Sequence, residues 1–173
     1  GREQGSLEGG QDLGVHPDRN TNLGIEVSTG SLGQGLPIAV GIALADRGKN
    51  VYCCISDGEC AEGSIWEAFR ITVDNNLSNL KIVVNSNGFS AYGQPATQGL
   101  IAGMQSFGLN LVEIDGHDLE SLSLALHLKT TKPLIVFAHT RVDQLPFLSG
   151  LSAHYYKMSP ADYEIALNIW SNS

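Results

Sequence analysis

The sequence predicts an α/β protein in which helices cover both faces of a mostly parallel sheet, a three-layer α/β/α arrangement. Short apolar runs that suit buried strands alternate with runs that have the length and apolar spacing of helices. The connections between them are short, and strand–helix–strand units of this kind make right-handed crossovers between parallel strands. At 173 residues the chain is long enough for one domain with a hydrophobic core, so we expect a single domain over 1–173.

The elements of the first half follow from composition and apolar spacing. Residues 1–23 are rich in Gly, Asp, Asn and Gln without a period, which indicates a loop or an extended arm. Residues 36–45 are apolar nearly all round and predict a buried helix. The apolar run 51–55 predicts a strand buried on both faces. A helix over 63–73 and a strand over 80–85 follow.

The second half repeats the alternation. Residues 97–106 predict a helix and 110–114 a strand, then 119–129 an amphipathic, leucine-rich helix and 133–138 the last strand. Residues 145–158 are irregular, and 160–170 predict a final surface helix. In parallel sheets ligands bind at the carboxyl ends of the strands, so the loops after the strands are where a site is expected.

Charge and cysteine content limit the class of protein. The formal net charge of −8 argues against a nucleic-acid or anionic-membrane surface, and no apolar run approaches the ~20 residues that span a bilayer. The polar residues 1–20 do not resemble a signal peptide. The three cysteines, Cys53, Cys54 and Cys60, are an odd number bunched within eight positions, which does not make a disulfide framework. Their spacing also fails the usual zinc patterns, which require a second Cys/His pair further along the chain. We expect free, buried or half-buried thiols and a cytoplasmic location.

Polar groups follow the first predicted strand. Asp57-Gly58 places a carboxylate beside backbone N–H donors, just before a helix. Mg²⁺ prefers oxygen ligands, and a helix N-terminus favours phosphates. An Asp-Gly pair alone is more often a plain turn. Asn87-Gly88 follows the next strand, where the asparagine offers an amide oxygen, and an Asn-Gly turn is again the alternative. If the two strands are neighbours, Asp57 and Asn87 converge at one edge of the sheet.

Asp57-Gly58, followed about thirty residues later by Asn87, resembles the metal–diphosphate motif of thiamine-diphosphate enzymes. The motif's opening glycine is replaced by Ser56. The resemblance implies that Asp57, Asn87 and the carbonyl of Phe89 bind Mg²⁺ or Ca²⁺ against the cofactor's diphosphate. It also implies the thiamine-diphosphate-binding fold, with Asp57, Gly58 and Asn87 in contact with thiamine diphosphate.

Residues 24–36 resemble the loop that precedes a buried helix in transketolases, and residues 16–18 resemble that family's His-Pro-Glu turn. A Gly-x-x-Gly-x-Gly pattern alone is weak evidence, but thirteen positions in register are more specific. This resemblance implies that Gly30, Leu32 and Glu59 also lie at the cofactor.

A third segment, Asp-Gly-His-Asp at 115–118, is similar to an element of the same family. We expect Asp118 to cap the following helix and His117 to hold structure in position rather than to catalyse. The resemblance extends over residues 14–138 and weakens beyond them.

Two further residues are implied as catalytic, Glu62 and His154. Transketolases place glutamates that correspond to Glu62 and Glu67 near the subunit interface, where they link paired active sites. From the sequence alone these are carboxylates in the first turns of a helix, where the helix dipole stabilises them. His154 matches, with a one-residue gap, a histidine near the diphosphate or substrate phosphate of the family's split members; a lone exposed histidine is the alternative.

The family's first segment, whose histidines line the substrate side, has no match in this sequence. Neither has the pyrimidine-binding domain that supplies the glutamate contacting the aminopyrimidine. The resemblance therefore implies one subunit of an α2β2 assembly, completed by a pyrimidine-domain partner. The reaction implied is transfer of a two-carbon ketol or acyl unit from a ketose to an aldehyde. Residues 139–146 depart from the family's usual Lys-Gly-rich loop, so the phosphosugar specificity stays open.

Two alternatives remain. One is another thiamine-diphosphate enzyme, of the deoxyxylulose-phosphate synthase or dehydrogenase type; residues 24–36 and 115–118 favour transketolase over these. The other is a non-catalytic transketolase-like scaffold subunit. Intact Asp57 and Asn87 argue against a scaffold, and the unmatched histidines argue for one.

Overall fold

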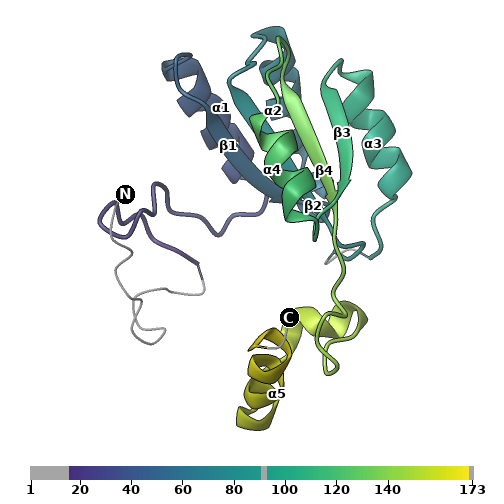
Figure 1. Ribbon diagram of the computed structural model, residues 1–173. Coiled ribbons are helices and arrows are strands. Elements are labelled where there is room, and N and C mark those ends of the chain that lie inside the picture. The colour runs from purple at the N-terminus through teal and green to yellow at the C-terminus, as the bar shows by residue number, and fades with distance from the viewer. Residues whose placement is uncertain (1–15, 91–92, 172–173) are drawn as a thin grey trace.

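The computed structural model describes residues 16–90 and 93–171 (Figure 1). Of the predicted arm over 1–23, residues 1–15 lie outside the described residues; within the remainder, Asn20 forms a short antiparallel bridge with Ile25. The elements are, in order, α1 (Gly35–Ala45), β1 (Val51–Ser56), η1 (Glu59–Ala61), α2 (Gly63–Asp74), β2 (Leu80–Ser86), α3 (Thr97–Ser106), β3 (Asn110–Asp115), α4 (Leu119–His127), β4 (Leu134–His139), η2 (Gly150–Tyr155) and α5 (Pro160–Ser171).

The sheet has four parallel strands in the order β1-β2-β4-β3, which confirms the predicted fold class. Because β1 and β2 are neighbours, Ser56 lies opposite Asn85 in the register. The loops that follow these two strands, with Asp57 in one and Asn87 in the other, therefore begin side by side.

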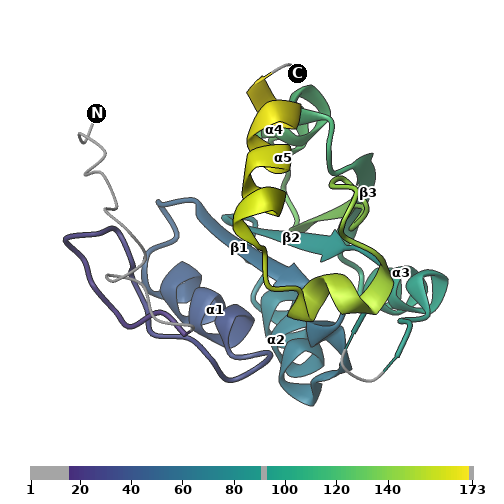
Figure 2. The same cartoon turned by 90° about the horizontal axis from the view of Figure 1, so that it is seen from below.

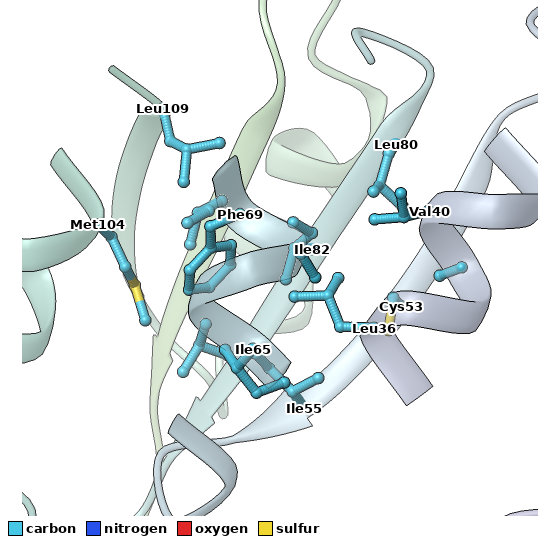
Figure 3. Packing of buried hydrophobic residues seen from close by; sticks show 14 of the residues in the cluster. Leu36, Val40, Cys53, Ile55, Ile65, Phe69, Leu80, Ile82, Met104 and Leu109 are labelled. Carbon is cyan, nitrogen blue, oxygen red and sulfur yellow. The ribbon is translucent and has the colours of Figure 1, made fainter. Parts of the chain in front are cut away.

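The main core lies between one face of the sheet and α1, α2 and α3 (Figure 3). Side chains at alternate strand positions point to this face, and Ile55, Ile82 and Phe137 pack there against Ile65 and other helical residues. Residues one position out of phase point to the opposite face, where Leu134 and Val136 pack against α4. A helix layer on each side of the sheet gives the three layers expected.

The predicted all-round burial of the first helix and first strand is wrong. Ile42 and Leu44 of α1 are 42% and 39% exposed, and Tyr52 and Cys54 of β1 are also exposed. In the described part of the chain β1 pairs only with β2, and α4 packs on the β3–β4 half of the second face. Tyr52 and Cys54, on the uncovered half of the second face, therefore face outward, whereas Ile42 and Leu44 lie on the exposed side of α1, which packs on the first face.

The C-terminal segment partly follows the prediction. The helix expected over 119–129 ends at His127, and the irregular segment 145–158 contains the short helix η2. In Figure 2, which views the molecule from below, η2 lies near the carboxyl ends of the strands. α5 has no buried residue, as expected for a surface helix. None of the helices in the described part of the chain has the length and apolarity that a membrane crossing requires.

Candidate functional site

Asp57 joins the loops that follow β1 and β2. Its side chain is 2% exposed. Oδ1 accepts the backbone N–H of Gly58 at 3.0 Å, and Oδ2 accepts the N–H of Gly88 at 2.9 Å and the hydroxyl of Ser86 at 3.2 Å. Three donors thus fix the orientation of a buried carboxylate, and the two loops converge as the sequence predicted.

The turn after β2 closes against Gly58. Asn87 Oδ1 accepts the N–H of Phe89 at 2.9 Å, an Asx turn, so the turn interpretation of Asn-Gly describes the local geometry. A Cβ added at Gly58 would lie 3.0 Å from the Cβ of Ser90 and 3.6 Å from the carbonyl oxygen of Phe89. Glycine is therefore needed at 58 for the turn to approach this closely.

Glu59 holds the glycine-rich loop, residues 24–34 before α1, to the end of β1. Its Oε1 accepts the N–H of Gly33 at 3.1 Å, and its Oε2 accepts the N–H of Ser56 at 3.0 Å. Ser64 donates its hydroxyl hydrogen to the carbonyl of Gly33 at 3.1 Å. Gly33 has φ +79°, and a Cβ there would lie 2.7 Å from the Cβ of Glu62, so the packing requires glycine.

A cavity of about 440 Å³, which we name the carboxyl-edge pocket, opens where these loops meet η2. Five residues singled out from the sequence line it: Leu32, Gly58, Asn87, Phe89 and His154. Its other lining residues are Ser56, Ser90, Arg141, Val142, Gln144, Leu148, Gly150, Leu151, Ala153 and Tyr155. Loops after three strands, the glycine-rich loop and η2 thus share one pocket.

Four of the singled-out residues do not line this pocket. Asp57 is buried, and Glu59 directs its carboxylate to Gly33 and Ser56. Gly30 packs on His16: a Cβ at Gly30 would lie 3.0 Å from the Cγ of His16. Glu62 stands at the N-cap position of α2. The structure therefore separates Gly30 and Glu62 from the pocket.

The segment after β4 also contributes to the pocket, which no motif in the sequence predicted. Arg141, Val142 and Gln144 line the pocket, although the sequence marks residues 139–146 only as a departure from the family pattern. Arg141 donates its backbone N–H to His117 Nε2 at 3.0 Å, which agrees with a positional role for His117. Asp118 caps α4 by accepting two backbone N–H groups, as predicted. The charge of Arg141 was the signal that could have drawn attention to this segment.

The oxygen donors at this edge suit a hard divalent cation. Asp57, Asn87 and Phe89 offer a carboxylate, an amide oxygen and a backbone carbonyl oxygen, the donor types that such a cation takes together with phosphate and water oxygens. Within 16–90 and 93–171 no group of three or more His, Cys, Asp or Glu side chains could hold a metal, so a metal here depends on this mixed set. Burial raises the pKa of the Cys60 thiol to about 12, so Cys60 stays protonated and offers no thiolate ligand.

Comparisons with known proteins agree with this arrangement. The family model described as "Transketolase, thiamine diphosphate binding domain" matches residues 9–144. The chain is 32% identical to one subunit of the apulose-4-phosphate transketolase of Actinobacillus succinogenes over 164 residues, covering 88% of this chain and 59% of that protein. It is 33% identical to human transketolase over 138 residues, covering 75% of this chain and 22% of that protein.

Solved structures of transketolases also match this chain. Transketolase from Campylobacter jejuni superposes with a TM-score of 0.62 at 31% identity, and one from Pichia stipitis with 0.64 at 29%; these cover 69% and 72% of this chain and 22% of each of those chains. A parallel α/β domain of this kind is the thiamine-diphosphate-binding fold. The chain belongs to the transketolase family. It spans about three fifths of the first relative named above and about a fifth of the full-length transketolases.

Proposed function

We propose that the chain is the diphosphate-side subunit of a thiamine-diphosphate-dependent transketolase-like enzyme. The enzyme transfers a two-carbon ketol or acyl unit from a ketose donor to an aldehyde acceptor. One observation carries the proposal: the buried Asp57 carboxylate accepts hydrogen bonds from both loops, and its neighbours Ser56 and Gly58 line one pocket together with Asn87 and Phe89.

Each residue has a distinct role in this proposal. Asp57, Asn87 and the Phe89 carbonyl hold Mg²⁺ or Ca²⁺ against the diphosphate. Gly58 lets the cofactor approach the backbone, and Leu32 supplies an apolar contact in the pocket. Thiamine diphosphate, when bound, supplies the nucleophilic carbon for cleavage of the carbon–carbon bond. His154 acts on the substrate or its phosphate from the η2 wall.

Three predicted residues act from outside the pocket wall. Glu59 positions the glycine-rich loop through Gly33. Gly30 shapes that loop where it packs on His16. Glu62, at the start of α2, serves the link between paired active sites rather than the chemistry itself.

Aminopyrimidine activation comes from a pyrimidine-domain partner in an α2β2 assembly. Support for a split enzyme comes from the Actinobacillus relative, whose name describes it as one subunit of a transketolase. This chain covers 59% of that subunit's length. Cys53, Cys54 and Cys60 are all free, in keeping with the reducing conditions of a cytoplasmic assembly.

Calorimetric titration of thiamine diphosphate with Mg²⁺ tests the proposal, with the chain alone and with a candidate pyrimidine-domain partner. We expect metal-dependent binding that Asp57→Asn weakens by about 100-fold or more, since it removes the charge that faces the metal. The matched control is Asp74→Asn, at the exposed end of α2, which should bind as the unaltered protein does.

Two outcomes would change the assignment. If folded protein binds no cofactor in either mixture, the scaffold alternative replaces an enzyme subunit. If binding is intact but transfer assays give products of deoxyxylulose-phosphate synthase or dehydrogenase chemistry, the family's cofactor site stands and the reaction is reassigned.

A further inference from the structure

The carboxyl-edge pocket has an uneven charge. Among the described residues that line it, Arg141 alone carries a permanent charge. His154 adds a positive charge only when its imidazole is protonated. Because the whole chain has a formal net charge of −8, a local cation has a large effect on whether an anion enters this pocket.

The backbone at Arg141 is fixed from the β2 side. Arg141 comes two residues after the end of β4. The preceding residue, Thr140, donates its backbone N–H to the carbonyl of Ser86 at 2.8 Å and its hydroxyl hydrogen to Asn85 Oδ1 at 2.6 Å. The segment that carries Arg141 is thus anchored to the strand whose following turn contains Asn87.

It is also fixed from the β3 side, by His117. His117 Nε2 accepts the backbone N–H of Arg141 at 3.0 Å, so this nitrogen carries no proton. Gln144 Nε2 lies 3.1 Å from both ring nitrogens of His117 and donates to the Arg141 carbonyl at 3.2 Å. Asp115 Oδ1 accepts the His117 backbone N–H at 2.9 Å, which holds the histidine itself. One imidazole therefore contacts both ends of segment 141–144.

We propose that Arg141 binds a phosphate group of the ligand in the carboxyl-edge pocket, and that His117 is the positioning residue that holds Arg141 there. A guanidinium is planar and forms paired N–H···O bonds with phosphate oxygens. The inference rests on the proposed function, which brings thiamine diphosphate to this pocket. A phosphorylated sugar substrate is a second source of the same group.

Calorimetric titrations separate the two sources. In one arm thiamine diphosphate with Mg²⁺ is titrated into the protein; in the other, inorganic phosphate is titrated into the protein loaded with cofactor. We expect Arg141→Gln to weaken one of the two affinities by roughly tenfold, with a smaller loss at high salt because screening reduces the contribution of the charge. A change in the thiamine diphosphate titration means that Arg141 binds the diphosphate of the cofactor. A change in the inorganic phosphate titration means that it binds the phosphate of the substrate.

Arg70→Gln is the matched control, because Arg70 lies on α2 in an exposed ion pair with Asp74 and not in the pocket wall. It removes the same charge from the chain. We expect affinities within about twofold of the unaltered protein in both arms, since the exposed charge is largely screened.

His117 is tested through its coupling to Arg141. His117→Leu removes the acceptor and should weaken the same arm, whereas His117→Gln keeps an acceptor near the Nε2 position and should restore most of the affinity. The double variant His117→Leu/Arg141→Gln should bind no more weakly than Arg141→Gln alone, because the histidine acts through the arginine. Additive losses would overturn the positioning role.

The outcomes separate this inference from the proposed function. Unchanged affinity and salt dependence of Arg141→Gln in both arms, with cofactor binding intact, would overturn the inference alone. Failure of the unaltered, folded protein to bind the cofactor would overturn the proposed function and the inference with it.

Discussion

The two walls of the carboxyl-edge pocket are built differently. The loop wall, residues 56–59 and 86–90, is tied together by buried or half-buried carboxylates: Asp57 accepts three hydrogen bonds and Glu59 two from the backbone. The tail wall, residues 141–156, starts at Arg141, which His117 fixes, and contains the buried Leu145, but it ends in η2, which has no buried residue. The hydrogen bonds of Ser152 and Tyr156 at this end are local and exposed. The loop wall thus belongs to the folded core, whereas the tail wall is held to the core at its start and its η2 end is an attachment.

The largest expected effect on stability is at Glu59. In Glu59→Gln one of the two backbone donors, from Gly33 or Ser56, faces an amide NH₂ instead of a carboxylate oxygen. We expect the free energy of unfolding to fall by about 2 kcal/mol, the usual cost of leaving a half-buried donor unsatisfied. Urea denaturation followed by circular dichroism measures it.

The control for this change lies on α5, which follows the tail wall. Glu164→Gln, on the exposed α5, removes the same charge where no residue of the helix is buried. Its unfolding midpoint should equal that of the unaltered protein. Equal losses in the two variants would contradict the distinction between a core-like loop wall and an attached tail wall.

An intermediate effect is expected at His154, on the tail wall. His154 is exposed, lines the pocket and contacts Tyr155 edge-on with ring centroids 4.8 Å apart. In the assembled enzyme we expect His154→Ala to lower kcat/KM by roughly 10–100-fold, as for loss of an acid–base group, with little change in stability. Steady-state kinetics with matched unfolding curves measures both.

His127→Ala is the control, since His127 lies on the exposed end of α4, away from the pocket. It should retain full transfer activity. If His154→Ala lowers stability and activity together, the tail wall is part of the core after all. If it changes neither, His154 is an ordinary exposed histidine.

The difference between locally determined and long-range contacts explains which features the sequence predicted. The sheet, its helices and the convergence of Asp57 and Asn87 followed from apolar runs and from the rule that parallel strands end at one edge. These features depend on patterns within each segment and on the parallel pairing that places the ends of neighbouring strands side by side. The Asp118 cap was predicted for the same reason, because the capping side chain and the N–H groups it accepts are close in sequence.

Pairings between distant residues were not predicted. The contact of His117 with Arg141 spans 24 positions, and that of Glu59 with Gly33 spans 26, with no periodic pattern to indicate either. The expected burial of Tyr52 and Cys54 was wrong because apolar residues alone do not tell which side of a strand is covered.

The smallest effect concerns the thiols, and it tests how tightly the loop wall is closed. Desolvation by the surrounding protein is the main cause that raises the pKa of Cys53 and Cys60 from 9.0 to about 12. The pKa of Cys54 is also raised, because the protein partly desolvates its thiol although the residue is exposed. At pH 8 we expect a thiol reagent to modify Cys54 slowly and the other two only after unfolding, because the thiolate is the reactive form. Mass spectrometry counts the modified sites, and Cys54→Ser should show none in the folded protein.

The same pKa shifts give a direction for stability. The unfolded chain loses its thiol protons near pH 9, whereas folded Cys53 and Cys60 keep theirs until about pH 12. The stabilisation of the folded state by these protonated thiols is therefore fully present below pH 9 and is lost as the pH rises from 9 towards 12. When the pH is raised from 8 towards 12, the midpoint temperature of thermal unfolding should fall less in Cys60→Ala than in the unaltered protein.

The thiol-modification experiment has a contrary outcome. If the reagent modifies Cys60 at pH 8 as fast as it modifies Cys54, η1 opens freely, and the loop wall is no more rigid than the tail wall.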